Sequence, residues 1–269
     1  MNLSNFQLAW ENLSLELDDP SMINDVHVLD YKVFEKNLKT VDKIFAFDLV
    51  EQLLMGDAFV LKQACSENTC KDIINWCFNN ISQTETSDYK IIEGVPNFHK
   101  IINEEIIKEK SLEQIKHSHY FFRWNNDSYG IWSKLTSLLD VAKLINGYDK
   151  NQHKSNTNSA GDTNCLEIVR YPSGGRQLEP NTHIKYNRKN LNYFLILNTR
   201  GEAYENGGFC AEGQYGDKVD FEMYLSAGDI LMHYPTINNY VEEVDTKSKL
   251  DWTSTNGKWI IDFYPNNFN

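Results

Sequence analysis

The spacing of hydrophobic residues changes about halfway along the chain. Four stretches of the first half have apolar residues at helical spacing: residues 42–55, 68–80, 101–116 and 130–145. Ser66 or Asn68 is suited to cap the second of these helices. A short apolar run at residues 58–62 predicts a strand between the first two. We therefore expect a mainly helical first half with one entry strand.

The second half has the two-residue spacing of strands. It follows a polar stretch, residues 147–163, that we expect to form a flexible surface loop. Seven runs rich in β-branched and aromatic residues predict strands: residues 166–171, 191–197, 208–211, 219–224, 229–234, 239–244 and 259–264. Short strands separated by Gly, Pro and Asn turns favour a sandwich or jelly roll. We predict one α+β domain, 1–269, with a helical N-terminal half, 1–146, flanking a mainly β core, 164–269.

Charge and composition narrow the class of partner. The 269 residues include 26 Lys and Arg against 38 Asp and Glu, a net charge of −12. The basic residues form no cluster suited to nucleic-acid phosphates or anionic lipid. No apolar run approaches the roughly 20 residues that cross a bilayer, and the five cysteines lack the spacing of a structural zinc site. We expect a cytoplasmic protein with reduced thiols and a small-molecule or peptide substrate.

Four short motifs of the second half give a more specific indication. They are Arg170-Tyr-Pro-Ser-Gly-Gly175, Leu197-Asn-Thr-Arg-Gly-Glu-Ala-Tyr-Glu-Asn-Gly-Gly208, Leu225-Ser-Ala-Gly-Asp-Ile-Leu-Met-His-Tyr-Pro-Thr-Ile237 and Gly257-Lys-Trp259. In this order and spacing, over about residues 165–264, the chain resembles the Fe(II)/2-oxoglutarate-dependent oxygenase superfamily. The entry segment, residues 59–70, is also similar to the start of many members. The resemblance implies a double-stranded β-helix, the jelly-roll or cupin-like fold, with a pocket inside.

The metal ligands that the resemblance implies are altered in this chain. Members hold iron with two imidazoles and one carboxylate. The His-x-Asp tripeptide of the family aligns with Asn181-Thr-His183, the distal His with Asn239, and the oxoglutarate-binding Arg with Lys258. Amides are poor Fe(II) ligands, and a register that starts at His183 places Lys185 where the carboxylate belongs. We therefore expect a degenerate triad and no cofactor, with Fe(II) and 2-oxoglutarate as the alternative.

Candidate site residues follow from these positions. His183 is the candidate catalytic acid or base. The candidate substrate-binding residues are Asn181, Asn239, Lys258, Tyr171, Tyr193, Arg123 and Trp124. The leading hypothesis is an oxygenase-like pocket protein, a biosynthetic enzyme, that acts on a small polar molecule or peptide by redox-neutral acid/base chemistry.

Structural roles compete with these assignments. Arg123 and Trp124 follow two phenylalanines and suit a core strand whose Arg extends outward. Lys258 suits a solvated surface position. Strand alternation puts Tyr193 on one face and Phe194 on the other, and either face can be the inner one.

Two rival functions remain open at this point. One is an active Fe(II)/2-oxoglutarate oxygenase with other ligands, such as His183, His233 and a carboxylate from Glu179 or Glu242. His233 equally suits core packing. The other is a non-catalytic pseudoenzyme whose pocket has become a binding surface.

Overall fold

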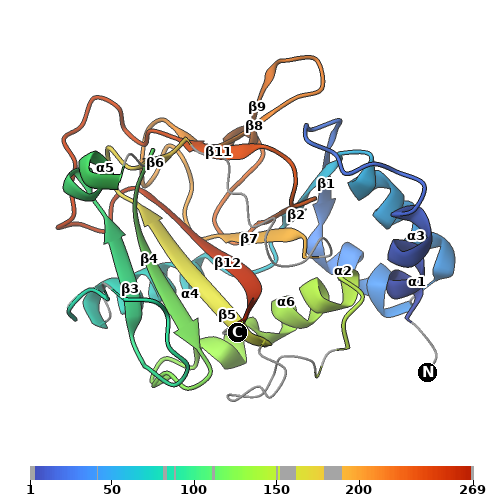
Figure 1. Ribbon diagram of the computed structural model, residues 1–269, viewed down its shortest axis with the longest axis horizontal. Helices are drawn as coiled ribbons and strands as arrows, with labels where there is room; N and C mark the ends of the chain where they lie inside the picture. The colour runs from blue at the N-terminus through green and yellow to red at the C-terminus, as the bar shows by residue number, and fades with distance from the viewer. Residues whose placement is uncertain are drawn as a thin grey trace.

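The computed structural model describes residues 4–40, 42–80, 84–87, 89–110, 113–149, 151, 162–178 and 190–267 (Figure 1). Helices and strands alternate in the first half: α1 (Asn5–Leu13), β1 (Val26–Asp30), α2 (Tyr31–Thr40), α3 (Lys43–Leu54), β2 (Ala58–Lys62), α4 (Glu67–Asn80), β3 (Phe98–Ile102), α5 (Glu104–Lys110), β4 (Gln114–Phe122) and α6 (Ile131–Ile145). Strands dominate the second half: β5 (Asp162–Tyr171), β6 (Arg176–Gln177), β7 (Asn192–Ile196), β8 (Gly208–Glu212), β9 (Lys218–Asp220), β10 (Ile230–His233), β11 (Asn239–Glu242) and β12 (Lys258–Asn267), with a short 3-10 helix at Phe221–Met223.

The strands form a curled sheet of two parts. The part that we call the major sheet has the order β1-β2-β10-β7-β12-β5-β4, with β3 paired to the edge of β4. The minor sheet has the order β6-β11-β8-β9, and β4 joins the two parts by pairing with β6 as well as β5. Strands far apart in the chain, such as β10 and β7 or β12 and β5, are thus neighbours. This is the expected mainly β jelly roll, and the fold prediction is confirmed.

Helices cover the outer face of the major sheet, as Figure 1 shows for α4 and α6. The Trp76 ring of α4 meets Phe121 of β4 edge to face at 5.3 Å, and Trp132 of α6 stacks on the same Phe121 at 6.0 Å. The predicted helices at 42–55, 68–80 and 130–145 are confirmed. Ser66 accepts a hydrogen bond from the Thr69 amide, so the expected cap is present.

Two of the predicted elements are wrong, and the described first half contains four strands, β1 to β4, where one entry strand was expected. Residues 101–116 do not form one helix, because Ile101 and Ile102 end β3, α5 takes up seven residues and β4 begins at Gln114. The expected strand 219–224 ends at Asp220, whose side chain accepts from the Glu222 amide and starts the 3-10 helix. In residues 101–116, strand pairing of β3 and β4 outweighed the helical spacing of the apolar residues. In residues 219–224, the Asp220 side chain caps the 3-10 helix and so ends the strand. The predicted loop 147–163 falls largely outside the described residues.

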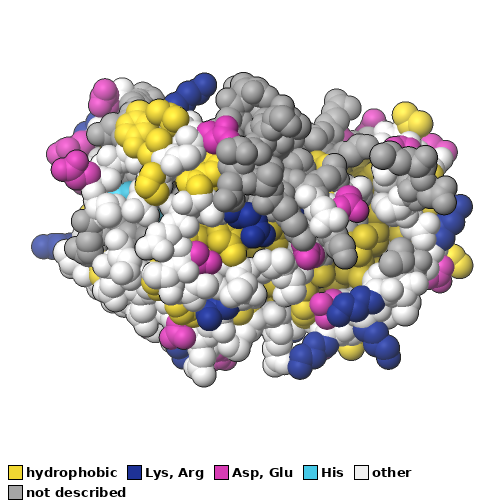
Figure 2. All heavy atoms as spheres, turned by 90° about the horizontal axis from the view of Figure 1, so that it is seen from below, with side chains coloured by type: hydrophobic (Ala, Val, Ile, Leu, Met, Phe, Trp, Pro, Cys, Tyr) yellow, Lys and Arg dark blue, Asp and Glu magenta, His cyan; other side chains and the backbone are white. Residues whose placement is uncertain are grey.

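The face in Figure 2 carries side chains of both charges among its described residues. Several Lys and Arg side chains lie near one another at the lower right, Asp and Glu side chains are scattered, and histidine is visible at one small spot. Among the described helices, none combines the length and the apolar composition needed to cross a bilayer.

Candidate functional site

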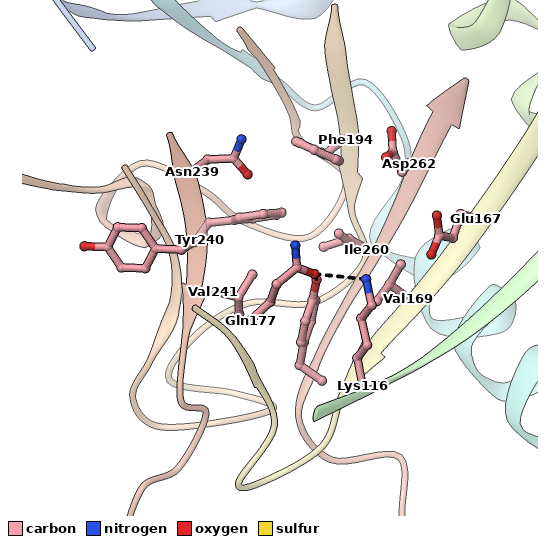
Figure 3. Close-up of a pocket in the computed structure, with 12 residues that line it drawn as sticks. Lys116, Glu167, Val169, Gln177, Phe194, Asn239, Tyr240, Val241, Ile260 and Asp262 are labelled. Atoms are coloured by element: carbon pink, nitrogen blue, oxygen red, sulfur yellow. Dashed lines mark hydrogen bonds between the residues drawn. The ribbon is translucent and has the colours of Figure 1, made fainter. Parts of the chain in front are cut away.

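A polar recess lies between the two sheets (Figure 3). Its lining residues come from strands of both sheets: Lys116, Glu167, Val169, Tyr171, Gln177, Phe194, Phe209, Asn239, Tyr240, Val241, Ile260 and Asp262. Apolar walls with a few converging polar groups are typical of small-molecule sites. Because these strands are neighbours only after the sheet has curled, the tertiary fold builds the recess.

Gln177 organises one side of the recess. Its Oε1 accepts hydrogen bonds from the Lys116 Nζ and from the Tyr171 hydroxyl, each at 3.0 Å. Figure 3 shows the Lys116 side chain reaching across the recess to this amide. The ammonium of Lys116 is therefore held in place beside the space where a ligand would bind, with donor capacity for an acidic group.

Two carboxyl groups form the opposite side. Asp262 of β12 stands directly across from Glu167 of β5, and both side chains line the recess. Burial raises the pKa of Asp262 well above its ordinary value, and the nearby Glu167 charge raises it further, against a smaller opposing effect of Lys116. Burial therefore favours the protonated, hydrogen-donating form of the Asp262 carboxyl group.

The raised pKa of Asp262 predicts a pH dependence of stability. Unfolding lets Asp262 ionise at its ordinary pKa near 4, so its contribution to stability is complete below that pH and is lost as pH rises through the folded pKa. Relative to Asp262→Asn, the wild type should lose stability from about pH 4 toward neutrality. Urea unfolding of both proteins at a series of pH values measures this. Parallel curves would contradict the raised pKa.

Three buried histidines form a second polar group, which we call the histidine cluster: His99 of β3 with His117 and His119 of β4. One ring nitrogen of each lies within 4.8 Å of the others, close enough to hold one metal ion. His99 Nδ1 and His117 Nε2 are hydrogen-bonded at 2.8 Å, and the rings of His117 and His119 lie 3.9 Å apart. Imidazoles suit iron, zinc, copper and nickel, so the donor set fits a transition metal.

The histidine cluster and the recess lie on opposite faces of the major sheet. Lys116 lines the recess, and the side chains of His117 and His119 alternate with it along β4. Neighbours of the cluster also face outward: the His119 ring stacks near Trp259 at 6.5 Å, and Arg170 lies over Phe78 of α4. A metal in the cluster would thus sit behind the wall of the recess.

Burial also sets the protonation of the cluster. Desolvation lowers the pKa of all three histidines, and it lowers the pKa of His119 to about 3. The neighbouring imidazoles and Arg170 lower the pKa of His117 and His119 further. All three imidazoles are therefore neutral at pH 7. The sequence analysis missed this cluster, although the His117-x-His119 spacing places two imidazoles on one face of a strand.

Lys258 has an internal partner in the structure. Its ammonium forms an ion pair with Glu222, and both side chains are fully buried. Tyr204 completes the group, because its hydroxyl donates to Glu222 at 2.7 Å and accepts from Lys258 at 3.3 Å. The surface-lysine alternative for Lys258 is wrong, and its proposed role toward an anionic substrate stays a prediction.

The remaining candidate residues are spread over the fold. Asn239 and Tyr171 line the recess. Tyr193 faces outward, where its ring meets Phe263 edge to face at 5.8 Å, so Phe194 is the inward residue of that strand. Asn181, His183 and the alternative ligand Glu179 lie outside the described residues.

Three further candidates have structural partners. The Arg123 guanidinium lies 4.5 Å from the centre of the Trp132 ring, and the Trp124 indole donates to the Val95 carbonyl at 3.0 Å. His233 is fully buried on the inner face of β10 and is hydrogen-bonded through Nδ1 to the Tyr234 carbonyl at 2.9 Å. Its pKa is lowered to about 4 by burial. Glu242, the other alternative carboxylate, pairs with Lys218 at 3.0 Å on the surface.

Comparisons with known proteins give matches in structure alone. No family model and no curated protein matches the chain. Similar solved structures include a prolyl-4-hydroxylase of Pseudomonas putida, with 8% identity, coverage of 79% of this chain and 93% of that one, and a TM-score of 0.48. A full-length protein of Neurospora crassa in complex with alpha-KG has 12% identity, coverage of 94% and 87%, and a TM-score of 0.47. JOX2 in complex with 2OG, Fe and JA has 10% identity, coverage of 99% and 84%, and a TM-score of 0.46.

TM-scores below 0.5 at such identities transfer no activity or residue role to this chain. The jelly-roll fold rests on the strand order of the sheet itself, in which β10-β7-β12-β5 and β6-β11-β8-β9 form the two halves of a double-stranded β-helix.

The expectation that the protein binds no cofactor is wrong. It considered the family's three ligand positions and no others, whereas the histidine cluster supplies a separate set of buried metal donors. Loss of the triad itself is not established either, because two of the three positions, Asn181 and His183, lie outside the described residues. The third, Asn239, is buried and donates its amide nitrogen to the Ile237 carbonyl at 3.1 Å.

Proposed function

We propose that this protein is an enzyme with an oxygenase-like fold that binds a small polar molecule or a peptide in the recess between its two sheets. The observation that carries the proposal is the lining of the recess, where Lys116, Gln177 and Asp262 converge between apolar walls. Such a lining orients a ligand through a few polar contacts while apolar contacts supply binding energy.

The histidine cluster favours a second, more specific candidate function, an Fe(II)/2-oxoglutarate oxygenase with non-standard ligands. A metal could lie in the recess or in the histidine cluster. In the recess, the amide of Asn239 stands where the family has its distal His, and an amide is a poor ligand for Fe(II). The histidine cluster offers three imidazoles. A bound Fe(II) would supply oxygen chemistry, and this candidate has more support than metal-independent acid/base catalysis at His183.

The residues of the recess have definite roles under the proposal. Lys116, held by Gln177, would pair with an acidic group of the ligand. Protonated Asp262 would donate a hydrogen bond or a proton to a ligand oxygen. Asn239 and Val241 would contact the ligand from the minor sheet.

A binding experiment with 2-oxoglutarate as the probe tests this function. Lys116→Met should weaken binding by about 10- to 150-fold, because a buried charge-assisted contact contributes about 1.5–3 kcal/mol. Lys134→Met is the matched control. Lys134 belongs to α6, its ammonium lies over the ring of Tyr129, and it does not line the recess. Calorimetric titration of both variants and the wild type gives the affinities.

Turnover separates the candidate functions in the same samples. Formation of succinate from 2-oxoglutarate in the presence of Fe(II) and oxygen would support the oxygenase. Binding without turnover would support the non-catalytic alternative. A folded wild type that neither binds nor converts 2-oxoglutarate would rule out the oxygenase candidate.

A further inference from the structure

We infer that His99, His117 and His119 form a structural metal site for a divalent ion such as Zn²⁺, and that this site is separate from the recess. The inference competes with the second candidate function, because an ion that only fixes the sheet is not the iron of an oxygenase, and it leaves ligand binding in the recess unaffected. It rests on the distances within the cluster, on the hydrogen bonds that orient its rings, and on the face of the sheet where it lies.

The three nitrogen positions are close to those of a bound ion. Zinc binds imidazole nitrogen at about 2.0–2.1 Å, so ligand nitrogens of a tetrahedral site lie about 3.3 Å from one another. In the cluster, His99 Nδ1 and His117 Nε2 are 2.8 Å apart, and all three ligand atoms fall within 4.8 Å. Small side-chain adjustments therefore suffice, and the ion would replace the hydrogen bond between His99 and His117.

Hydrogen bonds from outside the cluster hold two of the rings in a ligating orientation. His99 is bonded through Nε2 to the Thr84 hydroxyl at 2.9 Å, which leaves Nδ1 for the cluster. His119 is bonded through Nδ1 to the Ile168 carbonyl at 3.3 Å, and its ring lies 3.9 Å from that of His117. Metal-bound histidines typically have such a second contact, which fixes the tautomer and the ring plane.

The position of the cluster indicates a structural role. β3 pairs with β4 at the edge of the major sheet, and His99 stands directly across from His119 in that pair. An ion shared by the two strands would fix the edge strand to the sheet. The imidazoles are 0%, 3% and 1% exposed, and their side chains point away from the recess, so a metal here does not contact a ligand bound there.

The guanidinium of the neighbouring Arg170 forms its hydrogen bonds with backbone carbonyls rather than with the ring nitrogens of the histidine cluster. Arg170 is the cross-strand partner of His117. Its guanidinium donates to the backbone carbonyls of Asp251, Trp252 and Asn256 at 2.8–3.3 Å. These contacts hold the arginine on the 251–256 segment.

Zinc uptake by the full chain tests the site. After treatment with a chelator, the wild type should take up one equivalent of Zn²⁺, and its Tm should rise with free Zn²⁺. His99→Gln and His117→Gln should each bind Zn²⁺ roughly 100-fold more weakly or worse, since even loss of an outer contact costs 10- to 100-fold. His233→Gln is the matched control, because it removes a buried imidazole from the inner face of the sheet. It should bind Zn²⁺ as the wild type does.

X-ray absorption of the zinc-loaded wild type gives a second measurement that needs no variant, with three imidazole ligands expected. The inference is overturned by a wild type that takes up no Zn²⁺, by an absorption spectrum with fewer than three imidazoles, or by metal loss in His233→Gln with retention in His117→Gln. A catalytic rather than structural metal is indicated if His117→Gln keeps its Tm but loses metal-dependent turnover, and this also overturns the inference. Binding of 2-oxoglutarate without any Zn²⁺ uptake would overturn this inference and leave the proposed function standing.

Discussion

Lys258→Met should lower the free energy of unfolding by about 3–5 kcal/mol, because it leaves the carboxylate of Glu222 buried without its charge partner. Both side chains are fully buried, so water cannot compensate for the lost ammonium. Glu222 keeps two donors, the Tyr204 hydroxyl and the Phe209 amide at 2.8 Å. These bonds limit the loss but do not neutralise the charge. Urea unfolding at pH 7 gives the change.

The matched control for this variant is Lys218→Met. Lys218 also pairs with a glutamate, Glu242, at 3.0 Å, but the two side chains are 48% and 38% exposed. Exposed pairs contribute about 0–1 kcal/mol, so this variant should be close to the wild type. Equal losses in the two variants would contradict a special role for the buried pair.

Gly228→Ala, just before β10, should be strongly destabilising. Gly228 has φ +89°, and an added Cβ would overlap the Cys65 carbonyl oxygen. The carbonyl belongs to a segment fixed by the bond from the Cys65 amide to the Gly228 carbonyl at 2.9 Å. Strain at positive φ and the steric overlap together should cost about 3–5 kcal/mol.

Gly201→Ala separates these two contributions. Gly201 has φ +90°, but an added Cβ would meet nothing within 4 Å. Its cost should be about 1–2 kcal/mol, from the backbone conformation alone. The same urea unfolding measurement applies. If both variants lose the same stability, the contact with Cys65 has no effect and the argument for Gly228 fails.

Local patterns in the sequence determined most of the fold. The helix at residues 130–145 and the strands at residues 166–171 and 229–234 follow from the spacing of apolar side chains, which reflects the geometry of each element and its one buried face. The Ser66 cap could also be predicted from the sequence, because Ser66 bonds the amide of Thr69, only three positions further along the chain. The motifs around Gly228 and Lys258 then carried the resemblance that implied a jelly roll.

Contacts between distant residues were decided by the tertiary structure alone. His99 meets His119, and Glu222 meets Lys258, because strand pairing and the curl of the sheet bring them together. Register depends on every pair along two strands and on the turns between them, and a shift of one residue would turn His117 and His119 toward the recess. The sequence by itself therefore determined most elements of the second half, three helices of the first half, the class of fold and two residues of the recess, Asn239 and Tyr171. Which side chains share a face, which charges are paired and where a metal can bind were decided by tertiary packing, since these properties arise from long-range contacts that no local pattern encodes.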